Sequence, residues 1–108
     1  MGGYYNRKLE PIALDEWSKL LNDKVYQRVA ETTLPSGVWI STVWLGLDHR
    51  HGGFGLPLIF ESMAFDPSKP ETDTSRWSEL DAARYCTEEE ALAGHAAMVT
   101  RFKNKETT

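Results

Sequence analysis

The sequence predicts an α+β fold, in which a small antiparallel β-sheet of three or four strands carries an N-terminal and a C-terminal helix packed on it. Three observations lead to this prediction. Runs rich in β-branched and aromatic residues fill the middle of the chain, and the two most apolar runs are joined by a loop too short for a helical crossover. Amphipathic helical patterns flank these runs on both sides, so the expected order of elements is α-β-β-β-loop-β-α.

The first expected helix covers residues 14–23, LDEWSKLLND. Trp17, Leu20 and Leu21 recur at three- and four-residue spacing, which places them on one apolar stripe. Asp15 is the expected N-cap, because aspartate side chains accept hydrogen bonds from the N–H groups of a first helical turn.

The second expected helix covers residues 87–103, TEEEALAGHAAMVTRFK. Thr87 and Glu90 have the spacing of a capping box, and Glu88 and Glu89 favour the positive end of the helix dipole. The stripe that should face the sheet consists of Leu92, His95, Val99 and Phe102, with Ala91 and Met98 beside it.

Four strands are expected between the helices, separated by turns and loops. The second of them, VWISTVWLGLD, carries bulky apolar side chains on both faces, which predicts a central strand covered on both sides. The loop at 66–80 has two prolines, many polar residues and no periodicity, so it should lie on the surface. The expected strands are 24–33, 38–48, 57–65 and 81–86.

A single domain is expected, because 108 residues with 41% hydrophobic and 26% charged content are typical of a globular chain with one core. The domain should span 14–103, between a flexible arm at 1–13 and a frayed tail at 104–108.

Charge, cysteine content and hydropathy argue against several classes of protein. The net charge is −4 and the 12 Lys and Arg residues are scattered, so binding to nucleic acid is not expected. Cys86 is the one cysteine, which excludes an intrachain disulfide and fits a reducing compartment. No apolar run approaches about 20 residues and the first residues lack a signal-peptide core, so we expect a cytoplasmic protein without membrane contact.

The loop DHRHGGFG, residues 48–55, concentrates ionisable side chains between the two most apolar strands. Glycines allow close approach, loops on a rigid sheet commonly carry function, and histidine and aspartate bind metals or move protons. The alternative is an ordinary turn that Asp48 caps. The candidates for binding a ligand or partner here are Asp48, His49, Arg50 and His51.

Glu61 is a further candidate, because it interrupts an apolar strand. An ionised carboxylate among apolar neighbours is costly unless it is paired. Glu61 therefore either forms a structural cross-strand pair with Arg28 or Arg84, or takes part in ligand binding or catalysis.

His95 lies on the apolar stripe of the last helix, where it is either a hydrogen-bonded core residue or a catalytic group. Gly94 beside it would let another backbone come near. If that backbone is the 48–55 loop, then His49, Glu61 and His95 converge into a catalytic site. The candidate metal ligands of such a site are His49, His51 and His95.

Three strings occur in order along the sequence: STVWLGLDH at 41–49, PLIFESMAF at 57–65 and RYCTEEEALAGH at 84–95. Together they resemble a family of small proteins encoded by tailed bacteriophages and prophages. The resemblance extends from about Trp17 to Val99 and implies a phage protein made inside a bacterial host. The chain departs from the family after His49, where members often have an aromatic residue and further glycines, so His51 is less firmly tied to the family.

The favoured function is that of a non-enzymatic accessory protein, which binds a host protein or a small ligand as an inhibitor or counter-defence factor. The sequence requires no cofactor for this function. One alternative is a metal-dependent hydrolase or phosphodiesterase that uses His49, Glu61 and His95. A second alternative is a minor structural protein that forms a homodimer by pairing exposed strand edges.

Overall fold

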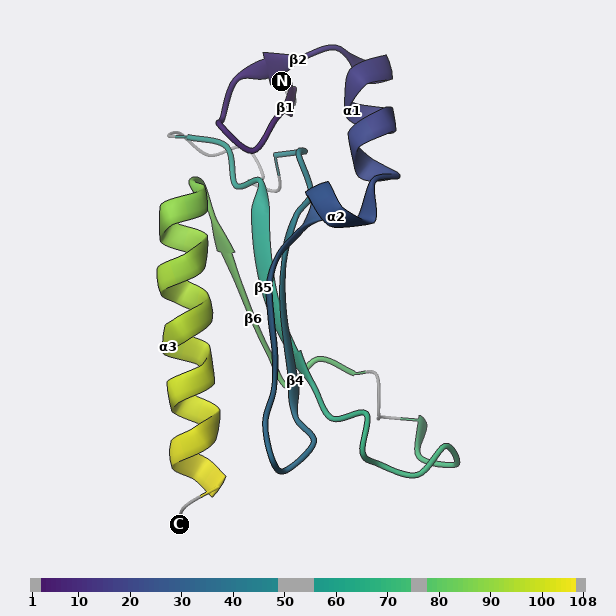
Figure 1. Ribbon diagram of the computed structural model, residues 1–108, viewed down its shortest axis with the longest axis vertical. Coiled ribbons are helices and arrows are strands. Elements are labelled where there is room, and N and C mark those ends of the chain that lie inside the picture. Colours follow the sequence, from purple (N-terminus) through teal and green to yellow (C-terminus); the bar gives the residue numbers. More distant parts are fainter. Residues whose placement is uncertain (1–2, 49–55, 75–77, 107–108) are drawn as a thin grey trace.

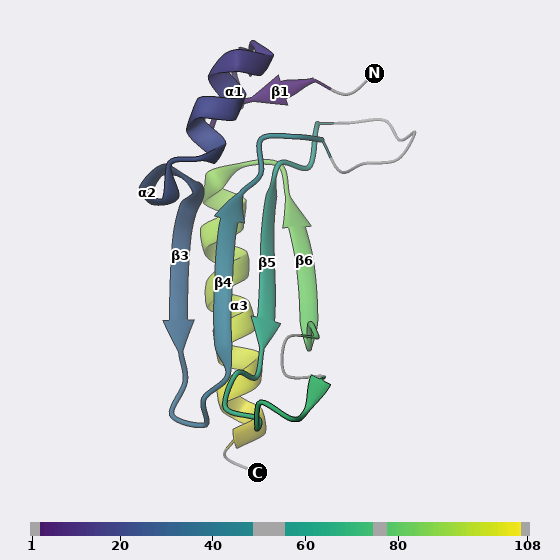
Figure 2. The ribbon, with the colours of Figure 1, turned by 90° about the vertical axis from the view of Figure 1, so that its right-hand side faces the viewer.

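The computed structural model describes residues 3–48, 56–74 and 78–106, and its centre is a four-stranded antiparallel sheet. Each strand pairs with the next strand along the chain, so the spatial order is β3-β4-β5-β6 (Figure 2). The predicted α+β class and the predicted antiparallel pairing are confirmed. The strands are β3 (Arg28–Thr33), β4 (Trp39–Trp44), β5 (Phe60–Phe65) and β6 (Asp81–Tyr85).

The C-terminal helix α3 (Glu88–Glu106) lies along one face of this sheet and contacts all four strands (Figure 1). Its predicted capping box is confirmed, since the Glu90 N–H donates to Thr87 Oγ1 over 3.1 Å and the Thr87 N–H donates to Glu90 Oε1 over 3.2 Å. The helix continues past the expected domain end at 103. None of the described helices is long and apolar enough to span a membrane.

The core lies between α3 and the face of the sheet that it covers. Alternate residues of β4 and β5 are buried on this face, among them Ile40, Trp44 and Phe60. The burial of these closely packed apolar side chains supplies the main driving force for folding. The helix contributes Ala91, His95, Met98 and Phe102 as its buried residues.

The predicted core stripe of α3 is wrong at one position. Leu92 is 46% exposed, and the preceding Ala91 takes its place in the core at 0% exposure. Ala91 lies in a cluster with Trp44 and Phe60, where the two large ring systems occupy most of the space and a methyl group completes the packing.

The N-terminal residues contain a short hairpin in place of the expected flexible arm. Strand β1 (Tyr4–Tyr5) pairs with β2 (Pro11–Ile12), and the hairpin is attached to the end of the sheet. The Tyr5 N–H donates to the Gly46 carbonyl over 2.9 Å, and Trp44 Nε1 donates to the Tyr5 carbonyl over 3.0 Å. Because Trp44 is buried, this bond also satisfies its indole N–H.

Two local predictions near the first helix are wrong. Helix α1 (Leu14–Leu21) begins after Ala13, which makes no side-chain cap, and Asp15 instead lies in the first turn. The first residues of the predicted 24–33 strand form the short helix α2 (Lys24–Gln27). The Asp23 carboxylate caps α2 by accepting the N–H groups of the second and third residues after it, over 3.0 and 3.1 Å.

Strand β4 is central, as predicted, but the prediction that it is covered on both sides is wrong for the described part of the chain. Helix α3 covers one face, while Figure 2 looks onto the other face with α3 behind the sheet. On that second face the β4 side chains are only half-buried, in contrast to the fully buried Ile40, Thr42 and Trp44. We call this second surface of the sheet the open face.

Candidate functional site

The predicted 48–55 loop site is described only at its first residue. His49, Arg50 and His51 lie outside the described residues. Asp48 Oδ1 accepts the Leu58 N–H over 2.9 Å, so its carboxylate joins the two ends of the connection between β4 and β5. This bond gives Asp48 a structural role at the base of the connection.

Glu61 forms the cross-strand ion pair that the sequence offered as one alternative. Its Oε2 atom lies 2.9 Å from Arg84 Nε, and the two residues are direct partners in the β5–β6 register. The Glu61 side chain is only 14% exposed and that of Arg84 is 45% exposed. The hydrogen-bonded guanidinium therefore compensates a largely covered carboxylate.

His95 is a hydrogen-bonded core residue, and it uses both ring nitrogens. Nδ1 lies 2.7 Å from Thr42 Oγ1, Nε2 lies 2.8 Å from Thr32 Oγ1, and the Thr42 hydroxyl is also bonded to that of Ser62. His95 is 7% exposed, and burial lowers the pKa of its imidazole below the ordinary value. This chain of hydroxyls fastens α3 to three strands, and it leaves the imidazole without room to receive a substrate.

The catalytic convergence of Glu61 with His95 does not occur. The two side chains lie on opposite faces of the sheet, because His95 contacts Thr42 while Glu61 is the cross-strand partner of the next residue, Val43. In the described part of the chain, no group of three or more His, Cys, Asp or Glu side chains could hold a metal ion.

Gly94 makes room for an aromatic ring. The approach of the 48–55 loop expected at this glycine concerns residues outside the described ones. A Cβ atom at Gly94 would overlap the phenol ring of Tyr85, which comes from β6. The absence of a side chain at this position thus allows α3 to lie close to the last strand of the sheet.

The open face carries three cross-strand rows, which grade from charged to aromatic. In the charged row, the Glu61–Arg84 pair lies near the end of the sheet that carries α2. In the aromatic row, the rings of Trp39 and Phe65 have centroids 5.8 Å apart. The rows are Arg28, Val43, Glu61 and Arg84; then Glu31, Ser41, Met63 and Ala82; then Thr33, Trp39 and Phe65.

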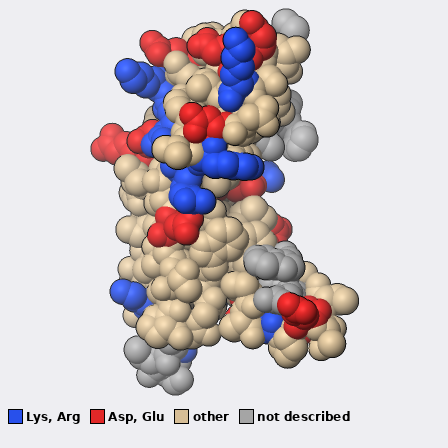
Figure 3. Space-filling model, turned by 45° about the vertical axis from the view of Figure 1, so that its right-hand side comes forward, with Lys and Arg blue, Asp and Glu red and all other residues tan. Residues whose placement is uncertain are grey.

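The surface beside the open face has the same division. Figure 3 shows mixed positive and negative side chains gathered on the upper half of the molecule, above a stretch of uncharged surface. The described part of the long connection between β5 and β6 projects from the body at the lower right. A partner that contacts the open face itself would meet the charged row at one end and the aromatic row at the other.

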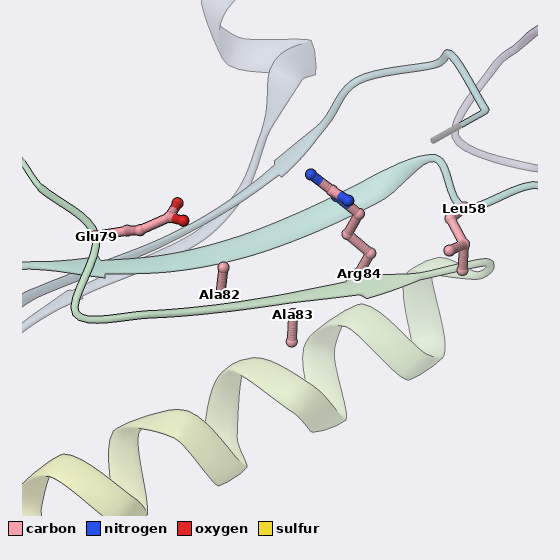
Figure 4. A pocket seen from close by; sticks show the side chains of 5 residues that line it. All are labelled: Leu58, Glu79, Ala82, Ala83 and Arg84. Atoms are coloured by element: carbon pink, nitrogen blue, oxygen red, sulfur yellow. The ribbon is translucent and has the colours of Figure 1, made fainter. Parts of the chain in front are cut away.

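A hollow of about 480 Å³ lies at β6, beside the open face. Three of its lining residues belong to β6 (Figure 4). Glu79 comes just before β6 in the chain, and Leu58 comes just before the neighbouring strand β5. Sequence reasoning missed this hollow, although the alanine pair inside a strand could have signalled it, since small side chains leave space at a sheet edge. The lining residues are Leu58, Glu79, Ala82, Ala83 and Arg84.

A second hollow, of about 460 Å³, lies where the N-terminal hairpin meets the start of α3. Arg7 occupies its wall, with Nε 2.7 Å from Glu88 Oε1 and Nη1 donating to the Tyr26 carbonyl over 3.0 Å. The hydrogen bond with Glu88 raises the pKa of Arg7. These partners give Arg7 a structural role, which sequence reasoning also missed.

Comparisons with known proteins provide no family assignment. The chain matches no protein-family model, and searches of curated proteins and of solved structures give no significant match.

Proposed function

We propose that the chain is a small phage-encoded accessory protein, which acts in the bacterial host by binding a host protein through the open face of its sheet. The observation that carries this proposal is the aromatic row of Trp39 and Phe65, which lies half-buried on the face of the sheet that α3 does not cover. An apolar surface on a rigid sheet is a common basis for protein association.

The residue types on the open face support a protein as the occupant. Trp39, Met63 and Phe65 belong to the types that are enriched at the centres of protein interfaces, and Arg84 belongs to the types that dominate binding energies. The ion pairs Glu61–Arg84 and Arg28–Glu31 would form a polar rim beside this centre.

The phage origin and the counter-defence role rest on a different observation, the three strings that resemble phage proteins. Binding alone is sufficient for an inhibitor, because a protein that covers a working surface of its target needs no chemistry of its own. The metal-dependent alternative lacks such support, since the described residues keep Glu61 and His95 on opposite faces.

The test is a binding comparison between variants. The double variant Trp39→Ala/Phe65→Ala removes the aromatic row, and Leu92→Ala removes an exposed apolar side chain from α3 as the matched control. A protein captured from bacterial host lysate is purified and titrated against each folded variant. We expect the double variant to weaken binding at least about tenfold and the control to leave it unchanged.

Several outcomes contradict the proposal. A purified partner that binds both variants with the same Kd places the interface elsewhere. A concentration-dependent dimer in solution that the aromatic double variant dissociates makes a second copy the occupant. A chain that captures no host protein is not the binding protein proposed.

A further inference from the structure

Strand β6 has an unpaired edge, because it is the last strand of the sheet in the described part of the chain. An edge strand presents backbone N–H and C=O groups that another extended chain can pair with. Proteins commonly protect such edges with charged side chains, prolines or β-bulges. The two edges of this sheet differ in that respect.

Strand β3, at the opposite edge, has such protection. It carries Arg28 and Glu31, and its register shifts between Arg28 and Ala30, as in a β-bulge. Strand β6 also carries two charged residues, Asp81 and Arg84, and the Asp81 carboxylate accepts the Ala82 N–H over 2.9 Å. Its pairing with β5 has no register shift, so the two edges differ in the β-bulge. Five residues of β6 give an edge of about 17 Å, enough to pair with a short extended segment.

The hollow at β6 follows this edge. Ala82 and Ala83 point to opposite sides of the strand, with Ala83 towards α3, yet both line the same hollow (Figure 4). The other lining residues include Leu58 and Glu79, which lie before β5 and β6 in the chain. A space that touches both sides of one strand extends around its edge, where an added strand would lie.

The charges of the hollow favour a basic occupant. Arg84 is compensated by its ion pair with Glu61. The carboxylate of Glu79 is exposed and forms no ion pair with another described residue. Among the described residues, Glu79 is therefore the charged lining residue of the hollow that no ion pair compensates, in a chain whose overall charge is −4. An uncompensated carboxylate attracts cationic groups of a partner.

We propose that β6 is a strand-addition site, which takes an extended segment of a partner protein. The segment pairs with the backbone of Asp81–Tyr85, carries Lys or Arg opposite Glu79, and sets small or apolar side chains against Leu58 and the two alanines. This inference deepens the proposed function, because it specifies how a protein partner is held, and it rests on that function.

The test uses a random dodecapeptide library, displayed and selected on the full chain. Selected peptides should be enriched in Lys or Arg among β-forming residues. Their synthetic copies, titrated by fluorescence anisotropy, should bind Glu79→Lys at least about tenfold more weakly than the unmodified chain. Glu31→Lys makes the same charge change at the β3 edge, so it is the matched control and should change the Kd less than about twofold.

A second measurement tests backbone pairing itself. In an extended strand, successive N–H groups point to opposite sides, so only alternate ones reach β6. Peptides N-methylated at one set of alternate positions should lose binding, and those methylated at the other set should keep it. Folding of both protein variants is checked by circular dichroism before titration.

The proposal is overturned if no peptide is enriched, if Glu79→Lys and Glu31→Lys have equal effects, or if both methylated sets bind alike. Dimerisation that competes with the peptides would make a second copy the occupant. Failure here is separable from failure of the proposed function: capture of a host protein through Trp39 and Phe65 would survive the loss of the strand-addition site.

Discussion

The two faces of the sheet place similar side chains in very different surroundings. Trp44 and Trp39 lie on the same strand, yet Trp44 is completely buried against α3 while Trp39 lies half-buried on the open face. Trp44 donates its indole N–H to the Tyr5 carbonyl and packs against Tyr26, whereas Trp39 contacts Phe65. The comparison teaches that apolar bulk on both sides of a strand does not imply a core on both sides.

This difference separates stability from binding. Side chains on the covered face are held by packing on all sides, so changes there should be read out as unfolding. Side chains on the open face are half-buried, so they have more surface to offer a partner.

The largest expected effect comes from the two tryptophans. Trp44→Ala should lower the free energy of unfolding by about 3–5 kcal/mol, because it removes a fully buried ring and leaves a cavity. Trp39→Ala should cost about 1 kcal/mol. Urea denaturation of both variants measures the difference, and equal losses would mean that the open face is as essential to the core as the covered one.

The next effect concerns the close approach of α3 to the sheet. Gly94→Ala should destabilise the protein by about 1–3 kcal/mol, because the new methyl group overlaps the Tyr85 ring. Without that ring, alanine would stabilise the helix by about 1 kcal/mol. The combination with Tyr85→Ala should therefore cost less than the sum of the single changes. A stabilised Gly94→Ala protein would contradict the close packing.

The free energy of unfolding should depend on pH through His95, which lies on the covered face. Burial lowers the pKa of His95 in the folded protein, so below the unfolded-state pKa of about 6.5 the unfolded chain binds a proton that the folded chain does not. The free energy of unfolding should fall as the pH drops below about 6.5, by at most about 1.4 kcal/mol per pH unit for this group. His95→Gln should flatten this slope, measured by urea denaturation across the pH range. An unchanged slope would show that His95 is not its source.

The smallest effect is expected at the ion pair of the open face. Glu61→Gln should change the free energy of unfolding by less than about 1 kcal/mol, because Arg84 is nearly half-exposed and its charge is solvated. A double-mutant cycle with Arg84→Gln measures the coupling between the two. A coupling of several kcal/mol would place this pair among the buried elements of the fold.

Sequence patterns predicted those parts of the fold that depend on neighbouring residues. The capping box of Thr87 and Glu90 marked the start of α3 because both of its hydrogen bonds form within one turn. The strands and their antiparallel order also followed from local patterns. Helix α2 was missed because β-branched and aromatic residues favoured a strand there, while the cap of Asp23 favours a helix.

The candidate site was less predictable, because it depends on which face each residue occupies. The pairing of Glu61 with Arg84 was one of two alternatives, and only the register decides between them. His95 could be assigned to the core from its helical position, but its bonds to Thr32 and Thr42 require the strands to be in place. The exposure of Leu92 likewise depends on how the helix is rotated over the sheet.

The order in which the four strands pair affects how the chain folds. Each strand pairs with its neighbour along the chain, so the sheet forms by short loop closures. The bond between Arg7 and Glu88 joins residues 81 positions apart, and α3 also packs against the distant β3. These long closures carry the larger entropic cost, so we expect them to form after the local ones. Until α3 docks, a nascent sheet exposes both faces and both edges, so the speed of helix docking sets the time during which folding chains can aggregate.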